Sequence, residues 1–273
     1  MKLILISSLL SILVVLTIIY VTPSTTPFSV FSNSPLGLSS AEKYFTPSNN
    51  VVIIVQPQRN VTQLVKGVLT NNGTVILVGD NSVINNTLKE FGAYIGSSII
   101  RDSVFNAGND SEIEVFYKGN LAVFYDSHPI YNVTPLVESS PYSYTVTQKG
   151  PFTVVGMIKV NNTGRIVVIS SPYVLTNYYI NENLKFLYAI VGNSAYVYPN
   201  VLSPLDYVKA LLNQLSYYSY IVLLSSLAVF GLKFKNKNER SKTVLERLLS
   251  LHPDWDENVL RRIYHDRGEE RSH

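Results

Sequence analysis

The stretch Val51–Asp80, VVIIVQPQRNVTQLVKGVLTNNGTVILVGD, decides the fold of this chain. It begins with the apolar run Val51–Val55 and ends with a second run, Val75–Val78, and strands that are apolar on both faces belong to a sheet covered on both sides. Between the runs, Val and Leu recur at positions 61, 64, 65, 68 and 69, the spacing of one helix face. A short helical link makes two such strands parallel, so the stretch predicts a βαβ unit.

Residues at the helix ends and after the first strand refine this prediction. Asn60 is expected to cap the first turn of the helix, and Gly73 to end it in a left-handed turn. The first strand is followed by Gln56-Pro57-Gln58-Arg59 and not by a glycine-rich phosphate loop. The unit therefore gives little support for a nucleotide site.

Further helices and strands are predicted on either side of the unit. Apolar residues at helical spacing predict helices near 41–45 (with Ser39 or Ser40 as cap), 84–92 and 184–191. Alternating patterns predict antiparallel strand pairs over 112–125 and 152–170. Because Ile166–Ile169 is wholly apolar, it is predicted to be a strand of the central sheet. The predicted class is α/β, a flavodoxin-like three-layer sandwich with extra β-hairpins.

Two long uncharged stretches bracket this region. As a helix, Leu3–Val21 would be about 28 Å long, which matches the roughly 30 Å hydrocarbon core of a bilayer. A secretory signal peptide is the rival interpretation, but Thr22–Pro27 offers no clear cleavage site, so an uncleaved anchor is favoured. Ala210–Leu232 is followed at once by basic residues, which predicts that the tail is cytoplasmic.

Glycosylation sequons support the same topology. Six N-x-S/T motifs lie between the two membrane stretches, and they begin at Asn60, Asn72, Asn85, Asn109, Asn132 and Asn161. The chain is expected to be a two-pass glycoprotein of the cell membrane, with its main domain outside and both termini cytoplasmic. The expected segments are a membrane helix (1–21), a stalk (22–27), an exterior α/β domain (28–206), a second membrane helix (207–232) and a helical tail (233–273).

Charge and residue content exclude several classes of function. Residues 22–232 carry 11 Lys/Arg and 11 Asp/Glu, so this neutral region has no electrostatic reason to bind nucleic acid. The chain has no cysteine, which excludes disulfides, thiolate metal sites and a cysteine nucleophile. No metal or cofactor is expected, because the four histidines are scattered: His128, His252, His265 and His273.

The order of several short motifs resembles a known family. A membrane helix and a Pro-x-Gly segment at 35–37 come first, followed by NNGTVILVGD at 71–80, IVVIS at 166–170, Leu175-Thr176-Asn177 and a helix beginning at Asn183. Residues 28–192 thereby resemble the membrane family catalogued as domain of unknown function 4350, whose exterior part is similar to class I glutamine amidotransferase domains. The resemblance implies that fold, a membrane setting and no established reaction. It suggests other membrane proteins and a MoxR-type ATPase system on the cytoplasmic side as partners.

Candidate ligand-binding residues follow the core strands, at the edge where open α/β sheets bind ligands. Asp80, Asn81 and Ser82 follow the second strand, and Ser171 and Asn177 follow the strand at 166–169. For each of them a turn or helix cap is the plainer interpretation. At the position of Ser171, members of the family commonly carry an acidic residue. No catalytic residue is assigned, since glutaminases need a cysteine and the G-x-S-x-G elbow of serine hydrolases is absent.

Three functions stay open at this level. The missing catalytic chemistry and the amphipathic patterns at 244–249 and 257–264 favour a non-catalytic exterior scaffold or binding module that couples an outside partner to the cytoplasmic tail. The tail helices would pack on a partner, on another copy or on the membrane, or else form a loose anchor. A degenerate amidotransferase-like hydrolase with a site at the C-terminal strand edge is the alternative, and a structural cell-envelope component is the third.

Overall fold

The structure is a computed structural model that describes residues 24–160, 164–199 and 203–214, with isolated residues from 11 to 22 and at 256, 259 and 262. The chain divides into two compact units after Leu212, and nearly all described residues belong to the first. The predicted membrane helices (1–21 and 207–232) and the tail (233–273) lie largely outside the described residues. Within the described part of the chain, no helix is both long enough and apolar enough to cross a bilayer.

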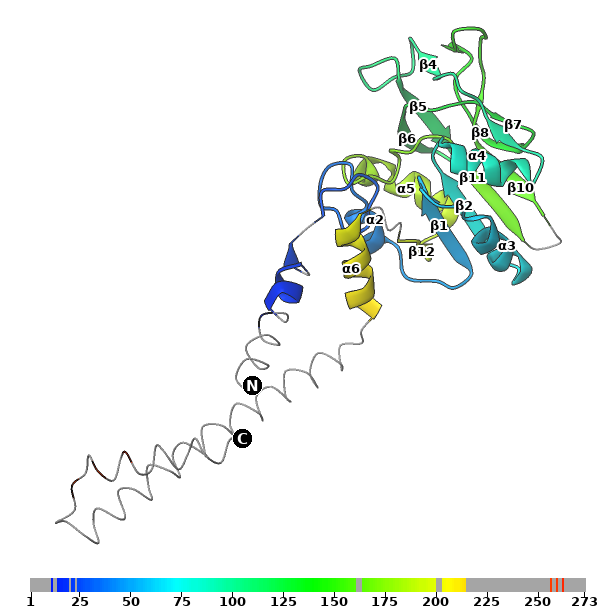
Figure 1. Cartoon of the computed structure of the whole chain (residues 1–273). Helices are drawn as coiled ribbons and strands as arrows, with labels where there is room; N and C mark the ends of the chain where they lie inside the picture. Colours follow the sequence, from blue (N-terminus) through cyan, green and yellow to red (C-terminus); the bar gives the residue numbers. More distant parts are fainter. Residues whose placement is uncertain are drawn as a thin grey trace. The chain divides into compact units, whose positions relative to one another are not determined.

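A six-stranded mixed sheet forms the centre of the fold, in the order β12-β1-β2-β11-β10-β8 (Figure 1). Its parallel strands are β12 (Tyr196–Val197), β1 (Val51–Val55), β2 (Thr74–Val78) and β11 (Arg165–Ile169). The antiparallel partners that extend the sheet are β10 (Thr153–Lys159) and β8 (Thr134–Glu138). The predicted parallel pair of the βαβ unit and the return of 166–169 to the central sheet are confirmed.

The central strands are buried on both faces, as their unbroken apolar runs predict. Alternate residues of one strand point to opposite sides of a sheet, so Ile54 and Leu77 belong to one core cluster and Ile53 and Ile76 to the other. Helices α3 (Thr62–Thr70) and α4 (Ser82–Lys89) contribute to the first cluster, and α2 (Ser39–Tyr44) and α5 (Ile180–Val191) to the second. The domain is therefore a mixed α/β fold with layers on both faces of one sheet.

Three short antiparallel ladders elaborate the domain. The predicted hairpin forms from β5 (Glu112–Tyr117) and β6 (Asn120–Tyr125), with φ of 48° at Lys118 and 77° at Gly119. Positive φ at both turn residues is the geometry that suits a two-residue hairpin loop. The other ladders pair β3 (Tyr94–Ile95) with β7 (Ile130–Tyr131) and β4 (Arg101–Asp102) with β9 (Ser143–Tyr144).

The ends of α3 differ from both predictions. The residue at the N-cap is Val61, which makes no side-chain capping bond, and Asn60 lies one residue earlier, where its Oδ1 accepts the N–H of Thr62 at 2.8 Å. The left-handed residue after the helix is Asn72, with a φ of 58°, and not Gly73. Gly73 is needed for another reason, because a Cβ there would lie 2.8 Å from the carbonyl oxygen of Val68.

Residues at both ends of the predicted exterior domain pack onto it. Ser24, which the sequence places in the stalk, is buried and donates its N–H to the carbonyl oxygen of Phe31. Helix α6 (Pro204–Gln214) begins where the domain was expected to end, and its buried Asp206 accepts a hydrogen bond from Ser29 Oγ at 3.0 Å. The packed chain of the first unit thus includes Ser24 and the first turn of α6.

Candidate functional site

Strands β2 and β11 are neighbours whose following segments leave the sheet on opposite sides. The segment after β2 enters α4, which packs on one face, and the segment after β11 leads to α5, which packs on the other. In open α/β sheets this topological switch point, at the C-terminal ends of the strands, is the usual place for a ligand. Asp80 follows β2 and Ser170 follows β11, so both stand at this point.

Asp80 is held by two side chains from distant segments. Its Oδ1 accepts a hydrogen bond from Gln56 Nε2 at 2.6 Å, and its Oδ2 lies 3.1 Å from His128 Nε2. Burial acts to raise the pKa of Asp80, but the hydrogen bonds from His128 and Gln56 outweigh it and hold the pKa below its ordinary value. Asp80 is therefore an ionised acceptor at neutral pH.

A second carboxylate, Asp126, faces the same place. Its pKa is raised, chiefly by burial, with attraction to His128 opposing the rise and repulsion from Asp80 adding to it. The pKa of Tyr173 is also raised, first by burial and then by the negative charge of Asp126. We call Gln56, Asp80, Asp126 and His128 the Asp80 cluster.

The backbone of the Asp80 cluster adopts conformations that side chains disfavour. Gln56 has a φ of 42° and Asp126 a φ of 49°, while Gly79 has a φ of 129°. A Cβ at Gly79 would lie 2.7 Å from Cδ of Gln56, so glycine is required for Gln56 to reach Asp80. Residues held at unfavourable φ cost on the order of 1–3 kcal/mol and gather at functional sites.

Three buried polar atoms in or beside the cluster have no hydrogen-bond partner among the described residues. They are Gln56 Oε1, Ser127 Oγ and His128 Nδ1. An unpaired buried polar group costs about 1–3 kcal/mol, and native proteins keep few of them. Their concentration at one switch point indicates hydrogen-bonding capacity that a bound ligand can use.

Comparison with known proteins adds little to this geometry. No family model and no curated protein matches the sequence. Among solved structures, the N-terminal domain of mmIFT52 is similar to this chain, with 12% sequence identity and a TM-score of 0.38, over 53% of this chain and 78% of that one. Function has to be inferred from the Asp80 cluster itself.

Of the predicted site residues, Asp80 alone belongs to the cluster. Asn81 caps α4, because its Oδ1 accepts the N–H of Ile84 at 3.0 Å. Ser82 is exposed at the first position of that helix. The hydroxyl of Ser171 is buried and donates to the carbonyl oxygen of Tyr125 at 2.7 Å.

Asn177 has a structural role at the start of α2. Its Oδ1 accepts the N–H of Ser40 at 2.8 Å, and its Nδ2 donates to the carbonyl oxygens of Ser32 at 2.9 Å and Ser34 at 2.7 Å. The predicted serine cap of this helix is therefore wrong, since Ser39 and Ser40 lie inside the helix and the cap comes from a residue far along the chain.

Gln56 and His128 are functional candidates that the sequence interpretation missed. Gln56 directly follows a buried strand. The reasoning that placed Asp80 at the C-terminal edge of the sheet therefore applies to Gln56 as well. His128 follows the hairpin and meets Asp80 only through the tertiary path of the chain, which no local pattern encodes. Within the described residues, no group of three or more His, Asp or Glu side chains is arranged to hold a metal ion.

The sequons differ in how they are placed. Asn60, Asn72, Asn109 and Asn132 are exposed, and Asn161 lies outside the described residues. Asn85 is half-buried, and its amide is bonded on both sides to the backbone of Ile95, which donates to Oδ1 at 2.7 Å and accepts from Nδ2 at 3.1 Å.

Proposed function

We propose that the α/β domain is a non-catalytic binding module that takes an amine-bearing ligand at the Asp80 cluster. The observation that carries this proposal is the Asp80 carboxylate, held by Gln56 and His128 at the switch point of the sheet beside three unpaired buried polar atoms. The amine is that of a small molecule or of a lysine side chain on an outside partner.

The charge of the cluster selects the class of ligand. Asp80 and Asp126 repel each other, so a phosphate or another anion would add to an unfavourable charge. Arg101 lies near enough to act on Asp126, but its guanidinium is bonded to Asp110 at 2.9 and 3.0 Å. An ammonium group would offset the negative charge of the half-buried Asp126 carboxylate. It donates hydrogen bonds and accepts none, and the carboxylate oxygens offer it several acceptor positions.

The hydroxyl groups of Ser127, Ser170 and Ser171 beside the cluster are all buried, which disfavours nucleophilic catalysis. Ser170 Oγ is buried and donates to the carbonyl oxygen of Val154 at 3.3 Å, and Ser171 Oγ donates to that of Tyr125. A nucleophile must reach both its base and a substrate carbonyl. Buried serines bonded to the backbone do neither.

A hydrolase is the second candidate, and one observation favours it. The contact between His128 Nε2 and Asp80 Oδ2 is the pairing that orients an imidazole for general-base catalysis. Treatment of the full chain with a fluorophosphonate probe separates the two candidates. A labelled serine whose labelling is lost in His128→Ala would favour the hydrolase, and an unlabelled chain favours the binding module.

We further infer that the domain is a variant of the flavodoxin-like sandwich, displayed outside the cell between two membrane helices. Parallel strands with helices on both faces support the first inference. The uncharged stretches Leu3–Val21 and Ala210–Leu232 and the sequons between them support the second. In this setting the tail at 233–273 would carry the binding signal to cytoplasmic partners.

Thermal denaturation of the full chain in detergent tests the proposed ligand class. We expect spermidine and L-lysinamide to raise the melting temperature, because a ligand that binds only the folded state stabilises it, and inorganic phosphate to leave it unchanged. The shift should disappear in Asp80→Ala, which removes the carboxylate without creating a sequon with Asn81 and Ser82. It should persist in Asp110→Asn, a carboxylate whose ion pair with Arg101 lies outside the cluster. Stabilisation by phosphate, or an amine effect that survives in Asp80→Ala, would contradict the proposal.

A further inference from the structure

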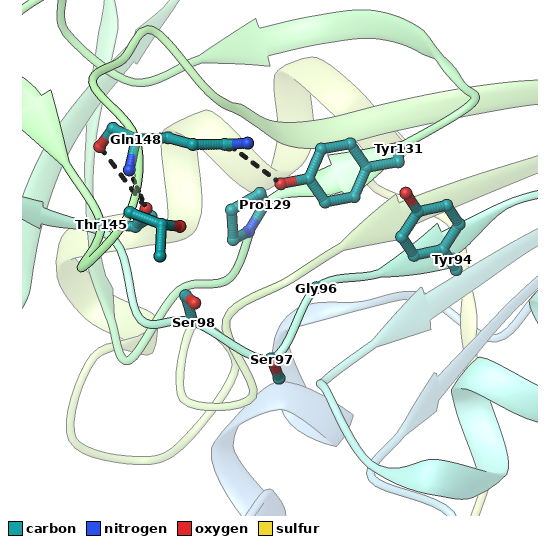
Figure 2. A pocket seen from close by; sticks show the side chains of 9 residues that line it. Tyr94, Gly96, Ser97, Ser98, Pro129, Tyr131, Thr145 and Gln148 are labelled. Atoms are coloured by element: carbon teal, nitrogen blue, oxygen red, sulfur yellow. Dashed lines mark hydrogen bonds between the residues drawn. The ribbon is translucent and has the colours of Figure 1, made fainter.

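A separate pocket of about 300 Å³ lies between the β3–β7 ladder and the turn at 145–148 (Figure 2). It shares no residue with the Asp80 cluster, and none of its nine lining residues carries a charge. Its volume is at the lower end of the range for small-molecule sites. The pocket therefore fits a small uncharged ligand and lies outside the function proposed above.

Two tyrosines form an aromatic wall on one side of the pocket. The rings of Tyr94 and Tyr131 are stacked, with centroids 4.9 Å apart and planes inclined by 23°. They come from adjacent strands and pair directly in the β3–β7 register. Tyr94 is 42% exposed although Tyr131 covers one of its faces, so part of its side chain is open to a ligand, while the accessible surface of the pocket as a whole is mainly polar.

Hydroxyl and amide groups form the facing side. Figure 2 shows the side chain of Gln148 extending to Tyr131, whose hydroxyl donates to Gln148 Oε1 at 3.4 Å. Ser97, Ser98 and Thr145 add hydroxyl groups around the same space. Amide and hydroxyl groups both donate and accept, so they suit a ligand that itself carries several hydroxyls.

The pocket is held in shape by the backbone around it. Gly96 donates its N–H to the carbonyl oxygen of Pro129 at 2.8 Å, and a Cβ at Gly96 would lie 3.0 Å from Cε2 of Tyr131. Thr145 closes the opposite turn, because its Oγ1 accepts the N–H of Gln148 at 3.1 Å and its own N–H donates to the Gln148 carbonyl oxygen at 2.8 Å. Rigid backbone on both sides lowers the entropy lost on binding.

We propose that this pocket binds a neutral saccharide ring. A pyranose has an apolar face of C–H groups, which stacks on a tyrosine ring, and a rim of hydroxyls, which bond to amides and side-chain hydroxyls. A charged ligand would lose its hydration without gaining an ion pair, because the pocket walls are uncharged. A neutral peptide is the competing occupant and is treated as an outcome of the test.

Two sources present the same chemistry at this place. The saccharide is either part of a glycan on another molecule or the chain's own glycan at Asn132, the exposed sequon asparagine that follows Tyr131 in the sequence. Thr134→Ala removes this sequon without changing Asn132, whose Nδ2 donates to the carbonyl oxygen of Gly92 at 3.1 Å. The variant therefore separates the two sources.

Saturation-transfer NMR on the full glycosylated chain in detergent tests the proposal, with mannobiose and N,N′-diacetylchitobiose as probes and glucuronic acid and triglycine amide as controls. We expect at least one neutral disaccharide to bind and both controls to fail. Tyr94→Ala should weaken binding about tenfold, the size of one lost aromatic contact. Gly96→Ala, which narrows the space beside Tyr131, should weaken binding as well.

Tyr142→Ala is the matched control, because Tyr142 is 61% exposed and stacks on Phe105 outside the pocket. It should bind like the wild type. Asp80→Ala should also bind like the wild type, which would make the result independent of the Asp80 cluster. If the disaccharide binds to Thr134→Ala but not to the wild type, the chain's own glycan occupies the pocket. Equal binding to the wild type and to Thr134→Ala supports a glycan on another molecule. Binding to neither form, binding of triglycine amide instead, or unchanged affinity in both Tyr94→Ala and Gly96→Ala would overturn the proposal.

Discussion

At the scale of single residues, the Asp80 cluster brings together two carboxylates, which accept hydrogen bonds, and few donors from the fold reach them. Asp80 receives hydrogen bonds from Gln56 and His128, whereas burial is the main influence on the half-buried Asp126, so the two carboxylates have different environments. One pKa falls and the other rises. Opposite pKa shifts on neighbouring carboxylates are typical of functional sites. A carboxylate whose ionised form is destabilised by folding contributes nothing to the stability of the fold.

Replacing Asp126 by asparagine should stabilise the protein at neutral pH. The raised pKa means that the ionised form of Asp126 is disfavoured by folding, and this penalty applies at pH values above the folded pKa. Asparagine carries no charge and tolerates the φ of 49°. We expect a higher melting temperature for Asp126→Asn at about pH 7, with the difference shrinking as the pH falls toward 3.8, the ordinary pKa of aspartate, because protonated Asp126 bears no penalty.

Melting curves of both proteins between about pH 4 and about pH 8 check this expectation. Asp110→Asn is the control, since Asp110 is already paired with Arg101 on the surface and the loss of that pair should change stability by less than about 1 kcal/mol. A lower melting temperature for Asp126→Asn at neutral pH, or a difference that does not change with pH, would contradict the assignment of Asp126.

Glycine at position 79 should be far less replaceable than glycine at position 67. Gly79→Ala introduces a Cβ at a φ of 129° and against Gln56, and it should lower the free energy of unfolding by about 1–3 kcal/mol. Gly67 lies inside α3 with open space around it, so Gly67→Ala should raise that free energy by about 0.5–1 kcal/mol. Urea denaturation measures both, and equal effects of the two substitutions would refute the close packing of Gln56 on Gly79.

At the scale of elements, apolar periodicity predicted the strands and helices, because burial determines their spacing. It failed at the helix ends, where single hydrogen bonds and backbone angles decide the structure. The strands β1, β2 and β11 and the helices α3 and α5 follow from apolar spacing, because burial on one or two faces dictates that spacing. The end of α3 depends on whether Asn72 or Gly73 turns left-handed, and either residue suits such a turn. The cap of α2 comes from Asn177, which no window around α2 contains.

Asn183 joins α5 to β6 and should be essential to the stability of this face of the domain. It is fully buried, its Oδ1 accepts the N–H of Val123 at 2.8 Å, and its Nδ2 donates to the carbonyl oxygens of Val123 at 3.0 Å and Val174 at 3.2 Å. Asn183→Leu leaves these three backbone groups unpaired, at about 1–3 kcal/mol each. We expect a loss of about 3 kcal/mol or more in the free energy of unfolding.

Denaturant unfolding together with hydrogen exchange at the Val123 amide measures this effect. Asn181→Ala is the control within the same helix, because Asn181 is exposed and its Oδ1 accepts a hydrogen bond from the hydroxyl of Tyr44 at 2.7 Å. Its loss should be about 1 kcal/mol or less. An Asn183→Leu protein as stable as Asn181→Ala would show that α5 and β6 are held together by apolar packing alone.

At the scale of the whole molecule, the sequence predicted the α/β class and located one edge of the candidate site. The apolar runs before Asp80 and before Ser170 place both residues at one end of a parallel sheet, and the structure brings them there. His128 could not be found this way, since it enters from a hairpin region outside the parallel core. The pocket at Tyr94 and Tyr131 was also hidden, because it forms between segments that are distant in the sequence.

The exterior topology leads to a prediction about glycan occupancy. Asn60 is exposed, whereas Asn85 uses both atoms of its amide to hold the backbone of Ile95. Asn85 is half-buried and leaves little room for a glycan, so Asn85 should be unmodified in folded protein while the exposed Asn60 carries a glycan. Glycopeptide mass spectrometry of protein from its own membranes checks both sites. A fully occupied Asn85 would contradict its role in the fold, and a chain without any glycan would remove this support for an exterior domain.

Native mass spectrometry of the full chain, gently released from its own membranes, examines the binding role of the Asp80 cluster without any assumption about the ligand. The wild type and Asp110→Asn should both carry the same additional mass, and fragmentation should identify an amine-bearing compound or a lysine-bearing partner. Asp80→Ala should lack that mass, because it removes the charge that Gln56 and His128 hold in place. The same bound mass on Asp80→Ala, or none on the wild type, would contradict a binding module built around Asp80.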